Sequence, residues 1–266
     1  MGQQPDRDSI TEPEITRTTR DIGDLRARLE RWLNSRVREA SISELEVPEN
    51  GMSSETVLFE ATWTDDDETS SAELVARLAA ADDAVPAFPD YDLAKQAKVM
   101  ELVGRTTTAP VPRVRWFEAD TTHLGCEFFV MDREHGVVPP DVMPYPIESS
   151  LLDAHENDQR RLQDSSVDVL AEIHRIPLEH SPGSVQSTAF LEFDEPGETA
   201  LRRHFNHWVG YERWACSGHS IGLLARTREW LEANWPTRAD EQEPVVSWGD
   251  GRIGNMMYRD FTPVAV

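Results

Sequence analysis

The sequence predicts an α+β protein in two parts, because strand signals and helix signals occupy different stretches of the chain. Between residues 42 and 132, short apolar segments alternate in the manner of strands, and one helical segment interrupts them. From residue 133 onward, apolar residues recur mainly at helical spacing. We therefore expect a sheet-containing part over residues 21–132 and a mainly helical part over residues 133–266.

The chain is expected to begin with a disordered lead-in and one amphipathic helix. Residues 1–20 alternate Ser, Thr, Pro and charged residues without an apolar period. Residues 21–40 then carry apolar side chains at helical spacing, namely Ile22, Leu25, Leu29, Trp32, Leu33 and Val37.

Three antiparallel strands are the simplest interpretation of the next stretch. Residues 43–63 contain the turn dipeptide Asn50-Gly51, and apolar residues alternate with polar ones after it. The acidic residues 64–71 form a turn before a third strand, AELVARLAA. A helix over residues 92–103 follows, and then VRWFEA and CEFFVM give two more strands. Five strands and one inserted helix are therefore expected in this part.

The second part is expected to be mainly helical. The Pro-rich segment PPDVMPYP has no regular period and connects the two parts. Helical spacing predicts helices over residues 160–174, 200–215 and 219–234, and Pro177 closes the first of them. Residues 245–266 contain two short apolar runs around a glycine-rich turn.

Composition narrows the classes of function. The chain has 49 acidic and 26 basic side chains, so its formal net charge is −23. A nucleic-acid binder needs concentrated Lys and Arg, and a membrane span needs about 18 consecutive apolar residues. The sequence has neither, and its first residues contain no apolar core of a secretory signal. We therefore expect a cytoplasmic protein with no nucleic-acid and no membrane partner.

One segment near the end of the chain points to chemistry. In WGDGRIGNMMY, Asp250 and Asn255 stand five residues apart on a glycine-rich loop between apolar anchors. Phosphoryl transfer uses a carboxylate that accepts the proton of the attacking hydroxyl and a neutral oxygen that binds Mg²⁺. This pair supplies both, although Asp250-Gly251 and Gly254-Asn255 are also ordinary turn dipeptides.

Further segments resemble, in order, the landmarks of one family. GMSSETVLFEATW resembles a phosphate-covering loop between two strands, AELVARL a third strand, and DLAKQAKVMELV the helix behind it. FFVMDREHG resembles a hinge between lobes, and LAEIHRIP the end of the helix before a catalytic loop. Together with WGDGRIGNMMY, these segments make residues 21–266 similar to the aminoglycoside phosphotransferase family, which has the protein-kinase-like fold.

The resemblance implies a two-lobed, protein-kinase-like fold. Residues 21–132 would form a nucleotide-binding N-lobe with a five-stranded antiparallel sheet and one inserted helix. Residues 133–266 would form a mainly helical C-lobe that contains the catalytic loop. This lobe would be incomplete, because the chain stops at Val266, before an Asp that bridges Mg²⁺ to the nucleotide in the family. Apolar surface exposed on such a lobe would favour self-association.

The resemblance also implies roles for single residues. Asp250 would be the catalytic base and Asn255 a ligand of Mg²⁺. Arg77 falls where the family has a basic residue that pairs the nucleotide phosphates, and Gln96 where a Glu usually pairs with that cation. Phosphate would also be bound by the loop before the second strand, through Gly51, Ser53 and Ser54. The adenine would lie against the hinge, beside Met131 and the backbone of Asp132, Arg133 and Glu134.

Simpler structural alternatives exist for several of these residues. Arg77 could be an exposed strand charge beside Glu73, residues 51–54 a hairpin turn, and Met131 the end of an apolar strand. In addition, Trp248 replaces the His that commonly precedes the Gly-Asp pair in the family.

The expected function is phosphate transfer from ATP or GTP, with Mg²⁺, to a hydroxyl of a small molecule. The acidic excess is interpreted as a solvated surface, with attraction of a cationic substrate as the weaker alternative. The alternative function is that of a truncated, catalytically inactive remnant that binds at most nucleotide. A nucleotide titration would distinguish these two functions from that of a scaffold protein that binds no nucleotide. A turnover assay would distinguish the active kinase from the inactive remnant.

Overall fold

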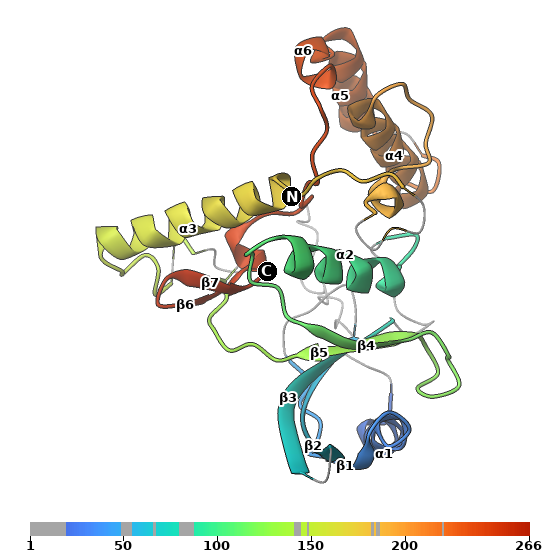
Figure 1. Cartoon of the computed structure of the whole chain (residues 1–266). Coiled ribbons are helices and arrows are strands. Elements are labelled where there is room, and N and C mark those ends of the chain that lie inside the picture. Colours follow the sequence, from blue (N-terminus) through green and yellow to red (C-terminus); the bar gives the residue numbers. More distant parts are fainter. Residues whose placement is uncertain are drawn as a thin grey trace, which may run out of the picture.

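The computed structural model describes residues 20–48, 55–65, 68–79, 88–140, 145–147, 149–181, 184, 187–219 and 221–266 (Figure 1). In these ranges the chain forms a five-stranded antiparallel sheet, a two-stranded sheet and six α-helices. The expected α+β class is therefore confirmed. The predicted lead-in lies outside the described residues, apart from Arg20.

The five-stranded sheet has the strand order β1-β2-β3-β5-β4. Its strands are β1 (Arg38–Ile42), β2 (Glu55–Asp65), β3 (Glu68–Leu78), β4 (Val114–Glu118) and β5 (Phe128–Asp132). All neighbouring strands are antiparallel, and one helix, α2 (Leu93–Thr106), is inserted between β3 and β4. The predicted number of strands and the inserted helix are thus confirmed, but the first strand is not where the sequence predicts it: β1 precedes residue 43 and overlaps the range predicted to be helical. The acidic turn expected over residues 64–71 is shorter than predicted, because β2 and β3 both continue into it.

The first helix is shorter than the sequence predicts. Helical spacing extends over residues 21–40, whereas α1 spans Ile22–Leu33 and β1 follows almost at once. Asn34 explains the difference. Its side-chain Nδ2 donates to the carbonyls of Glu30 (2.9 Å) and Ala40 (2.8 Å), and its Oδ1 accepts from the Ala40 N–H (2.9 Å). These bonds compete with helical ones and turn the chain into the sheet.

Helices α1 and α2 cover opposite faces of the sheet (Figure 1). Side chains alternate between the two faces along a strand, so each face has its own apolar cluster. On one face, Trp32 of α1 packs edge-to-face against Phe128 of β5, with ring centroids 4.8 Å apart. On the other face, Leu93 and Ala97 of α2 pack against Phe129.

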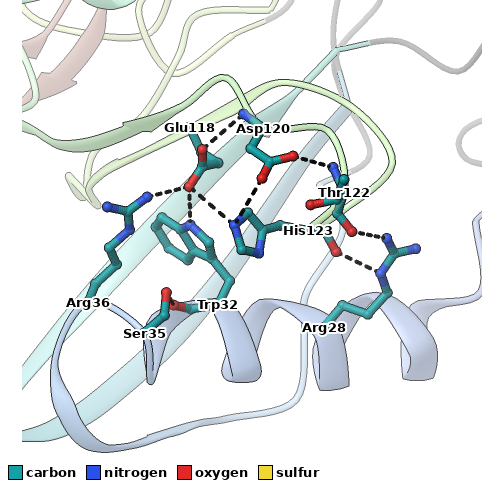
Figure 2. Close-up of polar contacts among 8 residues, drawn as sticks. All are labelled: Arg28, Trp32, Ser35, Arg36, Glu118, Asp120, Thr122 and His123. Atoms are coloured by element: carbon teal, nitrogen blue, oxygen red, sulfur yellow. Dashed lines mark hydrogen bonds and ion pairs between the residues drawn. The ribbon is translucent and has the colours of Figure 1, made fainter.

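A buried carboxylate joins α1 to the loop between β4 and β5 (Figure 2). Glu118 is 6% exposed and accepts hydrogen bonds from Trp32 Nε1 (2.9 Å), from the Asp120 backbone N–H (2.9 Å) and from Arg36. His123 Nε2 lies 3.7 Å from the same carboxylate. Burial alone would raise the pKa of Glu118, but the three hydrogen bonds outweigh burial and hold the pKa below its ordinary value.

The second part of the chain is mainly helical, as predicted. It contains α3 (Glu156–His174), α4 (Ala200–Ala215), α5 (Gly222–Ala233), α6 (Thr237–Asp240) and a hairpin of β6 (Met257–Arg259) and β7 (Thr262–Ala265). Helix α3 begins earlier than predicted because His155 caps it, accepting from the Asn157 N–H at 3.1 Å. Figure 1 shows α4, α5 and α6 together, away from α3. No helix in the described ranges combines the length and apolar character that a bilayer crossing requires.

Candidate active site

The glycine-rich loop singled out in the sequence lies between α6 and β6, and apolar residues hold both of its ends on α3. Val246, before the loop, is buried with Ile173. Met256, after the loop, is buried with Leu162. Trp248 packs partly against both clusters. The loop is therefore positioned by the longest helix that the structure describes.

Gly251 lies where this loop approaches α3 closely. A Cβ atom at position 251 would lie 2.9 Å from Leu170 Cδ2 and 3.3 Å from the carbonyl oxygen of Trp248. Both distances are shorter than ordinary contacts, so a side chain here would require a shift of the Leu170 side chain or of the loop.

The structure brings Asp250 and Asn255 into direct contact. A 3₁₀ turn over Ile253–Asn255 folds Asn255 back, and its Nδ2 donates to Asp250 Oδ2 (2.7 Å) and to the Asp250 carbonyl (2.9 Å). Arg252 Nε donates to the same Oδ2 at 3.2 Å, and the Arg252 backbone N–H donates to the Asp250 carbonyl at 3.0 Å. Two side chains thus hold one oxygen of the carboxylate, and these bonds do not involve Oδ1.

These contacts keep Asp250 in its anionic form. The hydrogen bond from Asn255, followed by the hydrogen bond and the positive charge of Arg252, lowers the pKa of Asp250. The Asp250 side chain is 70% exposed, and the hydrogen bonds outweigh the opposing effect of burial on its pKa. At neutral pH the carboxylate is charged and able to accept a proton.

The predicted hinge is bonded to the sheet on both sides. The Arg133 N–H donates to the Glu73 carbonyl, and the Asp132 N–H donates to the Arg113 carbonyl, both at 3.0 Å. Two of the three backbone N–H groups expected to meet an adenine therefore already have partners. A base bound here would use carbonyl groups or the N–H of Glu134.

The chain after the hinge lies directly against β6. Val137 and Tyr258 exchange two backbone hydrogen bonds, each 2.8 Å long. A Cβ atom on Gly136 would lie 2.5 Å from Met257 Cγ and 2.7 Å from the Tyr258 carbonyl oxygen. Because only glycine permits this approach, Gly136 joins the end of the five-stranded sheet to the strand that follows the loop of Asp250.

Arg77 and Met131 lie on the face of the sheet that α2 covers. Arg77 stands opposite Phe129 in the pairing of β3 with β5, and residues directly opposite point to the same face. Phe129 and Met131 pack in the cluster that contains Leu93 of α2. Burial lowers the pKa of Arg77, so this guanidinium is not a freely solvated strand charge. Gln96, also on α2, is partly buried.

The remaining predictions concern the phosphate-binding loop and the Mg²⁺ site. Gly51, Ser53 and Ser54 lie outside the described residues. Where the structure does describe the chain, no three His, Cys, Asp or Glu side chains gather as a metal site. Because Asn255 Nδ2 is bonded to Asp250, Asn255 Oδ1 is the atom that would face a cation. One amide oxygen beside one carboxylate fits Mg²⁺ only if nucleotide oxygens and water complete the coordination.

The sequence-based predictions did not include two residues of this region. Arg252 carries a cation between the paired Asp250 and Asn255, and that charge inside the motif was the available signal. Gly136 ends the hinge segment FFVMDREHG, but its contact depends on β6, which lies far along the chain. Only the fold brings these two segments together.

This architecture defines a class of protein. An antiparallel five-stranded sheet with one inserted helix, followed by a mainly helical part that carries an Asp–Asn loop, is a protein-kinase-like arrangement. The model of the phosphotransferase enzyme family matches residues 44–266, and the chain belongs to this family.

Solved structures of similar fold include two aminoglycoside phosphotransferases. A protein of Ralstonia eutropha JMP134, assigned only provisionally to that activity, gives a TM-score of 0.59 at 18% identity and establishes the fold. The match covers 90% of this chain and 63% of that one, so this chain spans less than two thirds of its relative's length. A thermostable mutant of APH(4)-Ia, in ternary complex with ADP and hygromycin B, gives a TM-score of 0.49 at 15% identity over 90% and 69% of the two chains.

Proposed function

We propose that the protein transfers the terminal phosphoryl group of ATP or GTP to a hydroxyl of a small molecule. The observation that carries this proposal is the geometry of Asp250, whose Oδ2 is held by Asn255 and Arg252 while its Oδ1 takes no part in those bonds. An anionic carboxylate whose Oδ1 lies outside the bonds that hold Oδ2 suits a group that accepts the proton of an attacking alcohol.

In this reaction the acceptor oxygen forms a new bond to the γ-phosphorus. The bond from that phosphorus to the β,γ-bridging oxygen breaks, and its electron pair leaves with ADP or GDP. The hydroxyl proton passes to Asp250 Oδ1. Because little covalent chemistry is left to the protein, the site acts mainly by positioning and by electrostatics.

We propose that residues 21–132 hold the nucleotide as an N-lobe and that residues 133–266 carry the reaction as a C-lobe. The base would lie near Met131, against the backbone of Asp132, Arg133 and Glu134. The phosphates would be met by Arg77, supported by Gln96, and by Gly51, Ser53 and Ser54. The partial burial of Arg77 supports its role, because a desolvated cation attracts phosphate more strongly than a solvated one.

Mg²⁺ would be bound by Asn255 Oδ1 together with phosphate oxygens and water. When bound, the ion would neutralise charge on the phosphates.

The acceptor would be a small molecule. Net charge of −23 favours a cationic one, such as an aminoglycoside, over an anionic one. The nucleotide donor is a cytoplasmic metabolite, and we propose that the protein acts in the cytoplasm.

A turnover assay with matched variants tests this proposal. The full chain is incubated with ATP or GTP, Mg²⁺ and a panel of hydroxyl compounds, and phosphorylated product is measured. We expect Asp250→Asn to lower turnover by about 10² or more while nucleotide binding stays nearly intact, as for a lost general base. Asp164→Asn is the control, since that carboxylate is exposed on α3. Equal activity of Asp250→Asn and wild type would refute the assignment of the base.

A further inference from the structure

The orientation of Asp250 comes from hydrogen bonds rather than from packing. With 70% of its side chain exposed, the carboxylate has few neighbours that could restrict its rotation. Among the described residues, the side-chain hydrogen bonds to this carboxylate are to Oδ2, from Asn255 Nδ2 at 2.7 Å and Arg252 Nε at 3.2 Å. Removing either donor would leave a single side-chain hydrogen bond on Oδ2 and give the carboxylate more freedom to turn.

Arg252 also holds the backbone of the same residue. Its N–H donates to the Asp250 carbonyl at 3.0 Å, so one residue contacts both the main chain and the side chain of Asp250. Asn255 does the same from the other end of the loop. The two residues of the loop therefore each bond both the carbonyl and the carboxylate of Asp250.

We infer that Arg252 is a positioning residue for phosphoryl transfer, acting through Asp250 by holding Oδ2 so that Oδ1 faces the acceptor hydroxyl. This inference rests on the proposed function. It differs from a direct role on the nucleotide, since the contact that carries it joins Arg252 to the carboxylate. Misplacement of a reacting group by about 1 Å lowers the rate on the order of 10²-fold. A carboxylate that is free to rotate should therefore lower kcat.

The first measurement compares kcat and KM for single variants of the full chain. Arg252→Ala should lower kcat about 10- to 10²-fold and leave KM for nucleotide and acceptor within about threefold, because binding is not its task. Arg252→Lys should recover part of the loss, since an ammonium can donate to Oδ2. Added methylguanidine should also partly restore the alanine variant. Arg226→Ala is the matched control, an exposed arginine on α5.

The deciding measurement is a double-mutant cycle with Asp250→Asn. If Arg252 acts through Asp250, replacing it by Ala in the Asp250→Asn background should cost less than about threefold. A loss as large as in the wild-type background would show that Arg252 acts on the phosphates directly and would overturn the inference. Wild-type turnover by Arg252→Ala would overturn it as well.

These outcomes are distinct from failure of the proposed function. A wild-type chain without phosphotransfer, or one whose Asp250→Asn variant is fully active, would refute the proposed function and this inference with it. A wild-type chain that depends on Asp250 but not on Arg252 would refute the inference alone. Thermal unfolding of each variant verifies that the fold is intact.

Discussion

Arg77 and Asp250, the two charged residues on which the proposed reaction depends most, lie in opposite surroundings. Asp250 is largely exposed, whereas Arg77 is partly desolvated on the sheet face beneath α2. Burial lowers the pKa of Arg77, but a guanidinium is so strongly basic that it stays charged at neutral pH. A cation in such surroundings interacts strongly with a phosphate that replaces water beside it.

We predict that Arg77→Ala weakens ATP binding about 10- to 10²-fold and adenosine binding little. Only the phosphates would lose a charge-assisted hydrogen bond, which contributes about 1.5–3 kcal/mol. Isothermal titration calorimetry with ATP and with adenosine provides the comparison. An equal loss for both ligands would indicate damage to the sheet instead, because Arg77 is paired with Phe129 between β3 and β5.

Glu118 is expected to make the stability of the fold depend on pH. Its folded-state pKa is lowered, so its hydrogen bonds stabilise the fold fully above the ordinary glutamate pKa of about 4.3. This contribution is lost as the pH falls through the lower, folded-state pKa. We therefore expect Glu118→Gln to reduce the free energy of unfolding by about 1–3 kcal/mol at pH 7 and by less at about pH 3.

Urea unfolding of both proteins between about pH 3 and pH 7 checks this expectation, and the quantity compared is their difference in stability at each pH. Taking the difference removes the contribution of other carboxylates. Trp32→Phe is a useful companion, because it keeps the aromatic packing against Phe128 and removes one donor to Glu118. A difference that does not change with pH would contradict the role given to the ionised carboxylate.

At the scale of elements, the junction between the hinge and β6 holds the sheet to the helical part. Val137 and Tyr258 pair as in a sheet, and Tyr258 in turn meets Ser166 of α3 with its hydroxyl, 2.8 Å from Ser166 Oγ. The strand after the candidate catalytic loop therefore contacts both the hinge and α3. A displacement of β6 would move the loop of Asp250 as well.

We predict that Gly136→Ala lowers the free energy of unfolding by about 1–3 kcal/mol, because its Cβ would overlap Met257 Cγ and the Tyr258 carbonyl. Thermal unfolding measures the effect. Gly104→Ala, within α2, is the control. A Cβ there has nothing within 4 Å, and alanine favours a helix over glycine by up to about 1 kcal/mol. If Gly136→Ala were as stable as Gly104→Ala, the contact between Gly136 and β6 would be able to adjust to the added Cβ atom.

Elements with a clear apolar period are those that the sequence predicts well. Helix α4 has the bounds expected from spacing alone, and β4 and β5 agree to within two residues. The early end of α1 depends on Asn34, whose side chain reaches Ala40 only once the chain has turned. The Asp250–Asn255 spacing predicted a pair, and the two do touch, although their roles remain predictions. Gly136 was beyond prediction because its neighbours lie on β6.

At the scale of the whole molecule, net charge and exposed apolar surface act in opposite directions. A formal charge of −23 makes two copies of the chain repel one another. Helices α4 and α5, which the structure describes in full, contain no buried residue. Their exposed apolar side chains include Trp208 (48%), Leu223 (65%) and Trp230 (62%). Large apolar side chains exposed on two helices favour association.

We predict that the chain self-associates through α4 and α5, and more strongly as salt is added. Raising the ionic strength from about 0.1 M to 1 M shortens the screening length from about 10 Å to 3 Å, which removes repulsion but not apolar attraction. Sedimentation velocity at the two salt concentrations measures the effect. Trp230→Gln and Leu223→Gln together should keep the chain monomeric at high salt. Val167→Gln, which removes an exposed apolar side chain from α3, should not. A wild-type chain that is monomeric at both concentrations would show that these helices do not associate.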